Sequence, residues 1–258
     1  MSRLRAKCPF CRAYTAVALG PDYQCHACGC EFAAGLVRVP RAWGEGGETM
    51  AEAAWLPLAY PEAGVVEADS PSAQACSLAL DLPERPMILG GCCCAHVGAV
   101  EALAARHGRV SLVWFDAHGD LNTPETSPSG NDWGMPLRTL LDSGAVAARD
   151  VALVGARALD PPEVEYIAAA RLHTGPDAIP GAVEGTAGVY VALDFDAFSV
   201  DEVAAFMPEP DGMTLAEAVD LLGGISSRAP VLGAGLSGLA AEERNVGPAA
   251  RLLAALGL

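Results

Sequence analysis

The sequence predicts an α/β protein with a mostly parallel sheet that is covered by helices on both faces, preceded by a small cysteine-rich unit. Short apolar runs suited to buried strands occur at 87–91, 110–118, 151–155, 189–196 and 231–236. Helical patterns accompany them at 96–108, 214–225 and 246–258. Alternation of strands and helices is typical of a parallel sheet. With 258 residues, 52% of them hydrophobic, the chain is long enough to bury such a core.

The composition limits the classes of partner and compartment. The formal net charge is −16, which argues against a nucleic-acid partner because phosphate binding needs clustered Lys and Arg. An acidic balance also fits a protein that gathers carboxylates to hold cations. We find neither the apolar run of a secretory signal nor a segment of membrane-spanning length, and we expect no membrane partner. The nine cysteines do not form a disulfide-like framework, so we expect a cytoplasmic protein.

The cysteine-rich unit, residues 1–37, resembles a zinc ribbon. Two Cys-x2-Cys pairs are separated by thirteen residues, a spacing that places four thiolates around a structural Zn²⁺. Such a metal would supply much of the folding energy of so short a segment. The alternative is a flexible tail with unpaired cysteines, and His26 or Cys30 could replace one ligand. The four expected ligands are Cys8, Cys11, Cys25 and Cys28.

Local patterns also predict a hairpin inside the ribbon and the borders of the segments that follow it. The stretch TAVALGPDYQC (15–25) alternates in polarity around a Gly-Pro-Asp turn, which predicts a β-hairpin inside the ribbon. Residues 38–60 are aperiodic and contain Pro, Gly and Trp, so they are interpreted as a connector. The remaining residues, 61–258, form the expected α/β domain.

Acidic clusters follow two of the expected strands. One reads Asp116-Ala-His118-Gly-Asp120 and the other Asp194-Phe-Asp196. Ligands of such sheets gather at the carboxyl ends of the strands, and alternate residues there can converge. Burying these groups is costly unless they bind cations. One imidazole and four carboxylates suit one or two divalent ions such as Mn²⁺, whereas the alternative is a set of solvated loop acids.

Several stretches are similar to the arginase–agmatinase–formiminoglutamase (ureohydrolase) family. The similarity is strongest at VWFDAHGDLNTPETSPSGNDWGMPL (113–137) and extends to VYVALDFDAF (189–198), LGG (89–91) and MPEPDGMTLAEA (207–218). The resemblance implies a doubly wound three-layer α/β/α fold and a binuclear Mn²⁺ centre. There, a metal-bridging hydroxide attacks a guanidino or amidino carbon of a small-molecule substrate. It also implies a homo-oligomer, a trimer or a hexamer.

Carried over by motif, the metal ligands of the family fall on the two acidic clusters. The resemblance implies that Asp116 and Asp194 bridge the two ions. His118 and Asp196 would complete the shell of one ion, and Asp120 would serve the other. The expected catalytic residues are Asp116, His118 and Asp120. Two ions at such spacing acidify a bound water and stabilise the tetrahedral charge that develops.

Contacts to an amino-acid head group also match in part. In family members selective for arginine, short polar side chains after the first acidic cluster hold the α-carboxylate and α-amino groups. The matching positions are Asn122, Ser127, Ser129 and Asn131, and Asp160 matches the acidic contact to the amino group. The other interpretation is ordinary loop chemistry, because Ser and Asn commonly stabilise turns.

Three positions depart from the family pattern. The motif Gly-Gly-Asp-His reads Gly90-Gly91-Cys92-Cys93, so Cys93 occupies the position of a metal-binding histidine. Trp133 replaces a histidine that helps proton transfer, and Ser237 replaces a glutamate that grips the guanidinium; both are expected substrate contacts. Because all three positions touch the metal or the reacting end of the substrate, we do not expect ordinary arginase activity. A less basic side chain on an amino-acid-like substrate is the more economical hypothesis.

The run LGGCCCAHVG (89–98) leaves several interpretations open. A disulfide between neighbouring cysteines would be strained, whereas small buried packing residues or a reactive nucleophile are both consistent with the sequence. We favour metal ligation by Cys93, helped by His96 one helical turn away. A thiolate would shift the metal preference from Mn²⁺ toward Zn²⁺, Fe²⁺ or Co²⁺. Alternatively that ion is absent, which leaves a mononuclear site of Asp116, His118, Asp194 and Asp196.

The sequence therefore predicts a metal-dependent hydrolase of a linear non-peptide C–N bond, acting through a metal-bound hydroxide. Two alternatives remain. One is a catalytically inactive relative that binds a metal or a metabolite as a regulatory subunit, favoured by the loss of the histidine and the glutamate. The other is a single-metal amide hydrolase or deacetylase-like enzyme on the same fold.

Overall fold

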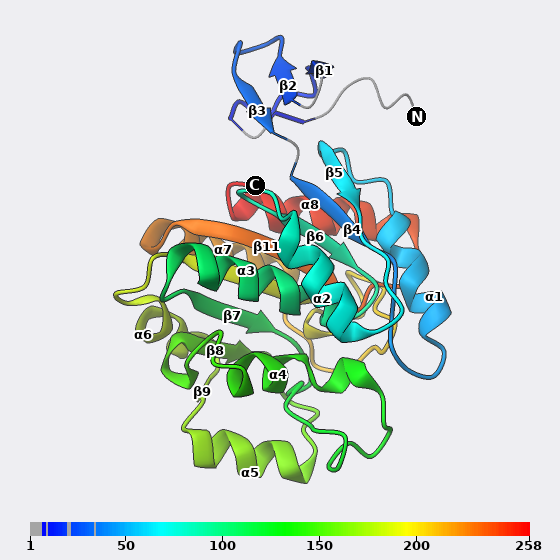
Figure 1. The fold of residues 1–258 in the computed structure, drawn as a ribbon, viewed down its shortest axis with the longest axis vertical. Helices are drawn as coiled ribbons and strands as arrows, with labels where there is room; N and C mark the ends of the chain where they lie inside the picture. The colour runs from blue at the N-terminus through cyan, green and yellow to red at the C-terminus, as the bar shows by residue number, and fades with distance from the viewer. Residues whose placement is uncertain (1–6, 9, 20–21, 34) are drawn as a thin grey trace.

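The structure is a computed structural model that describes residues 7–258, apart from residues 9, 20–21 and 34 (Figure 1). The described residues form an eight-stranded sheet flanked by helices and a separate three-stranded sheet near the N-terminus. The smaller sheet lies beyond one edge of the larger unit, next to strands β4 (Leu36–Val39) and β5 (Glu62–Val65), as Figure 1 shows.

All neighbouring strands of the eight-stranded sheet pair in parallel. The strand order is β5-β4-β6-β11-β10-β7-β8-β9, so the chain crosses over repeatedly and the longest strands lie in the middle. Parallel pairing of this kind requires crossover connections, which here are mostly helices. The bounds of the remaining strands of this sheet are β6 Met87–Gly90, β7 Ser111–Phe115, β8 Val151–Val154, β9 His173–Thr174, β10 Val189–Asp194 and β11 Val231–Ser237.

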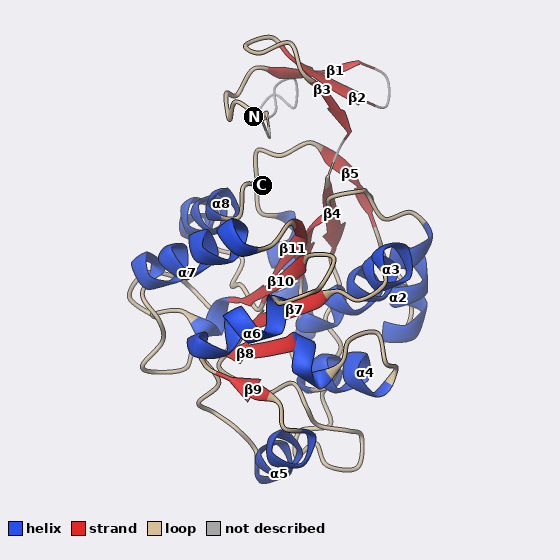
Figure 2. Cartoon of the chain, turned by 90° about the vertical axis from the view of Figure 1, so that its left-hand side faces the viewer, coloured by secondary structure: helices blue, strands red, loops and turns tan. Residues whose placement is uncertain are grey.

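Helices cover both faces of this sheet. Figure 2 shows α7 and α8 on one face and α2, α3 and α4 on the other. Alternate residues of β10 serve the two faces: Val191 packs in the core beneath α7 and α8, and Tyr190 packs in the core beneath α2 and α3. The expected three-layer α/β/α fold is therefore confirmed. The helices are α1 Gly47–Ala51, α2 Pro71–Leu80, α3 Val97–His107, α4 Pro136–Asp142, α5 Pro161–Ala170, α6 Ile179–Val183, α7 Leu215–Arg228 and α8 Val246–Ala255.

The expected connector contains more structure than its pattern indicates. Strand β4 begins at Leu36 and pairs with β5 and β6, so the border expected at residue 37 falls inside a strand of the main sheet. Arg38 interrupts the apolar run that would have marked this strand. Its guanidinium is buried, where it donates to Glu62 and to the carbonyl oxygen atoms of Ala54 and Leu56. A buried charge with a carboxylate and two carbonyl partners is compatible with a strand, but sequence periodicity cannot reveal those partners.

The small sheet consists of β1 (Ala16–Leu19), β2 (Asp22–Cys25) and β3 (Glu31–Ala33), all antiparallel. Strands β1 and β2 form the hairpin expected at 15–25, although its Gly-Pro turn lies outside the described residues. This unit contacts the main one through Arg12, which donates to the carbonyl oxygen of Ala254 at 2.7 Å.

No helix among the residues described is long and apolar enough to cross a membrane.

Candidate functional site

The first acidic cluster begins where β7 ends, and the second closes β10 and continues into the turn that follows. These strands are neighbours, and Leu193 pairs with Phe115 just before the clusters. The backbone then turns sharply on both strands, because the carboxylate of Asp116 accepts the N–H of His118 at 2.7 Å. Asp194 likewise accepts the N–H of Asp196 at 3.1 Å. These local turns bring the two clusters together at the carboxyl edge of the sheet.

One set of metal-ligating atoms is formed by Asp116, His118 and Asp196, whose donor atoms all lie within 4.8 Å of one another. Nδ1 of His118 is 2.9 Å from Oδ2 of Asp196 and 3.4 Å from Oδ1 of Asp116. Its Nε2 is 3.6 Å from a carboxylate oxygen of Glu209. This combination of one imidazole nitrogen and two carboxylates suits a divalent cation.

A second set is formed by Cys93, Asp116 and Asp120, all buried and also within 4.8 Å of one another. Asp120 does not simply follow the alternation of a strand, because β7 ends at Phe115 and Asp120 has a left-handed backbone with φ of 54°. Its Oδ2 is buried without a hydrogen-bond partner among the described residues. A buried carboxylate oxygen without a partner is costly, and a cation would satisfy it.

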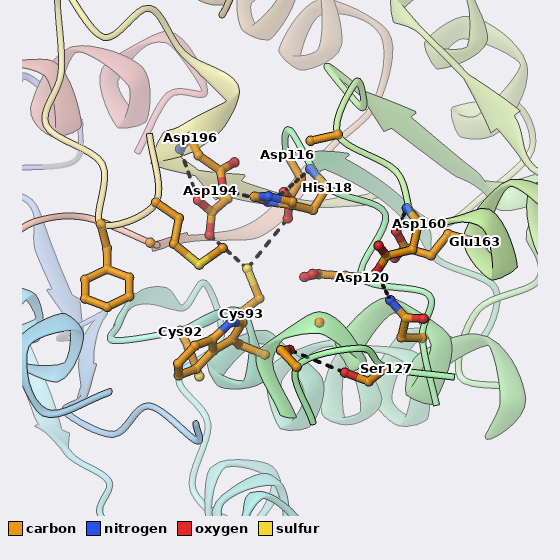
Figure 3. Close-up of a pocket in the computed structure, with 18 of the residues that line it drawn as sticks. Cys92, Cys93, Asp116, His118, Asp120, Ser127, Asp160, Glu163, Asp194 and Asp196 are labelled. Atoms are coloured by element: carbon orange, nitrogen blue, oxygen red, sulfur yellow. Dashed lines mark hydrogen bonds and ion pairs between the residues drawn. The ribbon is translucent and has the colours of Figure 1, made fainter. Parts of the chain in front are cut away.

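Asp194 lies beside the second set (Figure 3). Its Oδ2 is 2.9 Å from the sulfur of Cys93, and the same sulfur is 3.8 Å from Oδ2 of Asp116. The structure thus brings Cys93 and all four carboxylates of the two acidic clusters into one compact group. Trp114 holds Asp116 from behind, because its Nε1 donates to Oδ2 at 3.0 Å.

The electrostatics of this group favour cation binding. Burial, followed by the charge of Asp196, raises the pKa of Asp194 to about 7. Burial, followed by the charge of Asp116, raises the pKa of Asp196 to about 6. The pKa of Asp120 is also raised by burial and by the neighbouring carboxylates, and burial raises that of the Cys93 thiol further above its ordinary value. Crowded acids of this kind ionise together when divalent ions supply the opposite charge.

A cavity of about 280 Å³ opens above these groups. One wall is apolar and consists of Met50, Trp133, Phe206 and Met207. Trp133 and Phe206 meet edge to face with ring centroids 6.2 Å apart. A second part of the lining, the polar wall, contains Asn122, Ser127, Ser129, Asp160 and Glu163. The cavity can therefore hold a small molecule with one polar end and one end beside the carboxylates.

Most of the expected substrate contacts line this polar wall. Nδ2 of Asn122 donates to Asp160 at 2.9 Å, which fixes both side chains at the cavity. Asp160 is also the N-cap of α5, and its backbone N–H donates to the Glu163 carboxylate at 2.9 Å, which completes the capping box. Ser127 and Ser129 line the cavity, and their hydroxyls accept backbone N–H groups of the same loop. These serines therefore both stabilise the loop and form part of the cavity wall.

Three expected site residues lie elsewhere. Asn131 does not line the cavity, and its Oδ1 accepts the backbone N–H of Glu45 at 3.0 Å. Ser237 is fully buried behind Cys93 rather than exposed in the cavity. His96 belongs to neither ligand set: its Nδ1 is 3.0 Å from the Tyr190 hydroxyl and its Nε2 is 3.1 Å from that of Ser237. Both ring nitrogens of His96 therefore face hydroxyl groups.

Sequence reasoning missed two acidic residues at the site. Glu163 is buried and accepts the backbone N–H of Leu121 at 3.0 Å, next to Asp120. Glu163 comes three residues after Asp160, with two prolines between them, and this spacing is the signal of a capping box. Glu209, near His118, comes from the loop before α7, and no local pattern marks it as a neighbour of the site.

The four ribbon cysteines form a further set of ligand atoms within 4.8 Å of one another. The two pairs have matching local geometry: the carbonyl oxygen of Cys8 accepts the N–H of Arg12, and that of Cys25 accepts the N–H of Gly29. Arg12 and Gly29 both have positive φ, 61° and 75°. His26 and Cys30 are outside this set.

Comparison with known proteins identifies relatives by sequence. A profile of the arginase family matches residues 64–256. An arginase of Staphylococcus aureus (strain COL) is 41% identical over 92 residues, which cover 32% of this chain and 30% of that enzyme. An arginase of Bacillus caldovelox is 30% identical over 181 residues, 60% of each chain. The matched segments thus span less than two thirds of the length of these relatives.

A solved structure shares the fold over a greater length. The arginase of Bacillus subtilis superposes with a TM-score of 0.74, covering 86% of this chain and 97% of that chain, at 21% sequence identity. At this identity the likeness concerns the fold.

Proposed function

The chain belongs to the arginase family, and from that premise we propose that it is a metal-dependent hydrolase of a linear C–N bond in a small amidino, guanidino or amide substrate. The single observation that carries this proposal is the charge of the cavity. Six carboxylates line it (Asp116, Asp120, Asp160, Glu163, Asp194 and Asp196), whereas no lysine or arginine of the described residues does. So many buried carboxylates need cations to balance their charge, and Asp116 belongs to both ligand sets.

The residues present fit two divalent ions. Asp116, His118 and Asp196 would hold one, and Cys93, Asp116 and Asp120 would hold the other, with Asp194 beside both. When bound, such ions supply Lewis acidity and acidify a water that serves as the nucleophile. The unpartnered oxygen of Asp120 is the observation that supports the second ion. Mn²⁺ is the family expectation, and a Cys93 thiolate would move the preference toward Zn²⁺, Fe²⁺ or Co²⁺.

The chain's own residues would orient the substrate and manage its protons. Asn122 and Asp160 would bind a polar head group, because they present an amide and a carboxylate at one end of the cavity. Glu209 and Asp196 flank the two ring nitrogens of His118, so this imidazole is held in place at the edge of the two ligand sets. Trp133 would cover the reacting end and exclude bulk water there.

The substrate is proposed to carry a weakly basic or neutral reacting group. Ser237, where the family has a glutamate, is buried behind Cys93 and offers no charge to the cavity. Trp133, where the family has a histidine, offers no proton donor of comparable acidity. A guanidinium would therefore lack its usual charge-assisted partner, whereas a neutral amide or formimino group would not need one.

The ribbon is proposed to hold one structural Zn²⁺ through its four clustered cysteines. Its two matching turns resemble paired metal knuckles, and none of the ribbon residues that the structure describes lines the cavity. The ribbon would then stabilise the N-terminal segment rather than act in catalysis.

The proposed activity is tested by incubating the metal-loaded protein with amino-acid-derived guanidines, amidines and amides and measuring release of urea, formamide or ammonia. We expect hydrolysis of one neutral or weakly basic class and little turnover of arginine. The His118→Ala variant is the matched control and should lose that activity. If the wild-type protein hydrolyses none of these classes while both ions are bound, the protein is an inactive, binding relative.

A further inference from the structure

A chain of hydrogen-bonded side chains lies directly behind Cys93, on the side away from the cavity. Ser237 Oγ is 3.1 Å from the Cys93 sulfur. His96 Nε2 is 3.1 Å from the same hydroxyl, and Nδ1 on the other side of the ring is 3.0 Å from the hydroxyl of Tyr190. Ser237, His96 and Tyr190 are all fully buried. The described structure thus contains a polar chain of three residues in an otherwise apolar layer.

The fold holds this chain in a single arrangement. Tyr190 lies on β10 and Ser237 ends β11, whereas His96 ends the short turn Cys93–His96 that leads into α3. Gly235 leaves room for it, because a Cβ at that position would overlap the imidazole and the tyrosine hydroxyl. Trp114 packs edge to face on the imidazole with centroids 5.4 Å apart. The ring is therefore enclosed by neighbouring strands.

The direction of each hydrogen bond in this chain of side chains follows from the acceptor at one end, the carboxylate of Asp194. Ser237 donates its one proton to Oδ2 of Asp194 at 3.0 Å. The serine oxygen then accepts from Nε2 of His96, which leaves Nδ1 to accept from the tyrosine hydroxyl. Burial lowers the pKa of His96 to about 3, consistent with a neutral ring that donates through one nitrogen only. Each buried polar atom of the chain is thereby satisfied.

We propose that Ser237, His96 and Tyr190 are positioning residues that fix the Asp194 carboxylate and the Cys93 sulfur for metal binding, with His96 as the central link. This inference rests on the proposed ligation of a divalent ion by Cys93. The hydroxyl of Ser237 touches both groups, at 3.0 Å and 3.1 Å, so it sets the distance between them. Outer partners of this kind orient ligands and tune the metal without touching it. His96 therefore acts on the ion through Ser237, not as a direct ligand.

The test is titration of Co²⁺ into the metal-depleted, full-length protein, followed by near-ultraviolet absorption from thiolate-to-cobalt charge transfer. Each spectrum is compared with that of Cys93→Ala, so that the absorption of the ribbon cysteines cancels. We expect Ser237→Ala and His96→Gln to weaken Co²⁺ binding at the Cys93 site by about 10- to 100-fold and to alter the band. Tyr190→Phe, which removes only the last hydroxyl and should preserve folding, is expected to give a smaller loss.

A matched control separates positioning from general stability. Ser111 is also fully buried, and its hydroxyl donates to the carbonyl oxygen of Gly188 at 3.1 Å, at the opposite end of the sheet. Ser111→Ala should lower the melting temperature while leaving the cobalt band unchanged. If both Ser237→Ala and Tyr190→Phe bind Co²⁺ with wild-type affinity and show the wild-type charge-transfer band, the positioning role is wrong, whereas ligation by Cys93 still stands. A wild-type spectrum identical to that of Cys93→Ala would overturn the ligation by Cys93, and the positioning role with it.

Discussion

Oδ2 of Asp194 lies 2.9 Å from the sulfur of Cys93, although the two residues are 101 positions apart in the chain. One closes β10, and the other follows β6; β11 lies between these strands in the sheet. The thiol is therefore placed among the carboxylates by the sheet itself. A cysteine at the carboxyl edge of a parallel sheet, surrounded by acids, is in a position to share a cation with them.

The metal-free protein should lose stability as the pH rises through the weakly acidic range. The pKa values of Asp194 and Asp196 are about 7 and about 6 in the folded chain, whereas an unfolded aspartate has a pKa of about 4. The folded state then binds more protons than the unfolded state between about pH 4 and pH 7, so this contribution to the free energy of unfolding falls as pH rises.

Chemical denaturation of the chelated protein across that range measures the effect, with Asp194→Asn as the control. The wild type should show a more negative slope of stability against pH than the variant. Added metal should reverse the trend, because ligands bind in their deprotonated form. Identical slopes for the chelated wild type and Asp194→Asn would contradict the proposed crowding of buried acids.

Glu163→Gln should destabilise the loop that carries Asp120. Glu163 accepts the backbone N–H groups of Leu121 and Asp160, and a glutamine has one acceptor oxygen instead of two. We expect a loss of about 1–3 kcal/mol in the free energy of unfolding, together with weaker metal binding. Glu165→Gln on the exposed face of the same helix is the matched control and should change neither. Equal stability of the two variants in a denaturant titration would show that the capping contacts of Glu163 do not matter.

Gly238→Ala should displace the carboxylate of Asp194 and so disturb the proposed metal site. Gly238 has φ of 64°, and a Cβ there would overlap the carboxylate of Asp194. The left-handed backbone alone costs a non-glycine residue about 1–2 kcal/mol. The variant should therefore lose stability and bind fewer ions, as measured by thermal unfolding and elemental analysis. In the control Gly223→Ala, which lies in α7 with open space around the new methyl group, stability should rise by up to about 1 kcal/mol.

Removal of one ribbon cysteine should affect the ribbon alone. Cys8→Ser is expected to lower the zinc content by one ion per chain and to collapse the dispersed amide NMR signals of β1 to β3, because the unit has only a small core of its own. Cys30→Ser is the control, since Cys30 is outside the ligand set, and should retain the ion. Zinc retention by Cys8→Ser, or equal loss in both variants, would contradict the four-cysteine site.

The central fold could be predicted because its strands are buried on both faces. Runs such as VALV at β8 are apolar throughout, which marks a parallel sheet without further information. Strand β4 could not be recognised in this way, because Arg38 is buried through partners that lie 16 to 24 positions away. Local patterns carry no record of such long-range contacts.

The part of the candidate site that lies at the carboxyl ends of parallel strands could be predicted from the sequence. Acidic residues that end neighbouring strands must converge, as Asp116 and Asp194 do. His96 was expected beside Cys93 on one helical face, but the short 3-10 turn Cys93–His96 directs its ring toward Tyr190 and Ser237 instead. Glu209 approaches His118 only through the tertiary fold, so no spacing rule could have found it.

The proposed metal centre is tested most directly by the number of metal ions bound by the wild type and by Cys93→Ala, measured by elemental analysis of the full-length protein after loading with Zn²⁺ or Co²⁺. We expect three ions per wild-type chain, two at the carboxylate group and one in the ribbon, and two per Cys93→Ala chain. Equal metal content and equal activity in the two proteins would contradict ligation by Cys93. A wild type that holds only the ribbon ion would contradict the proposed metal centre as a whole.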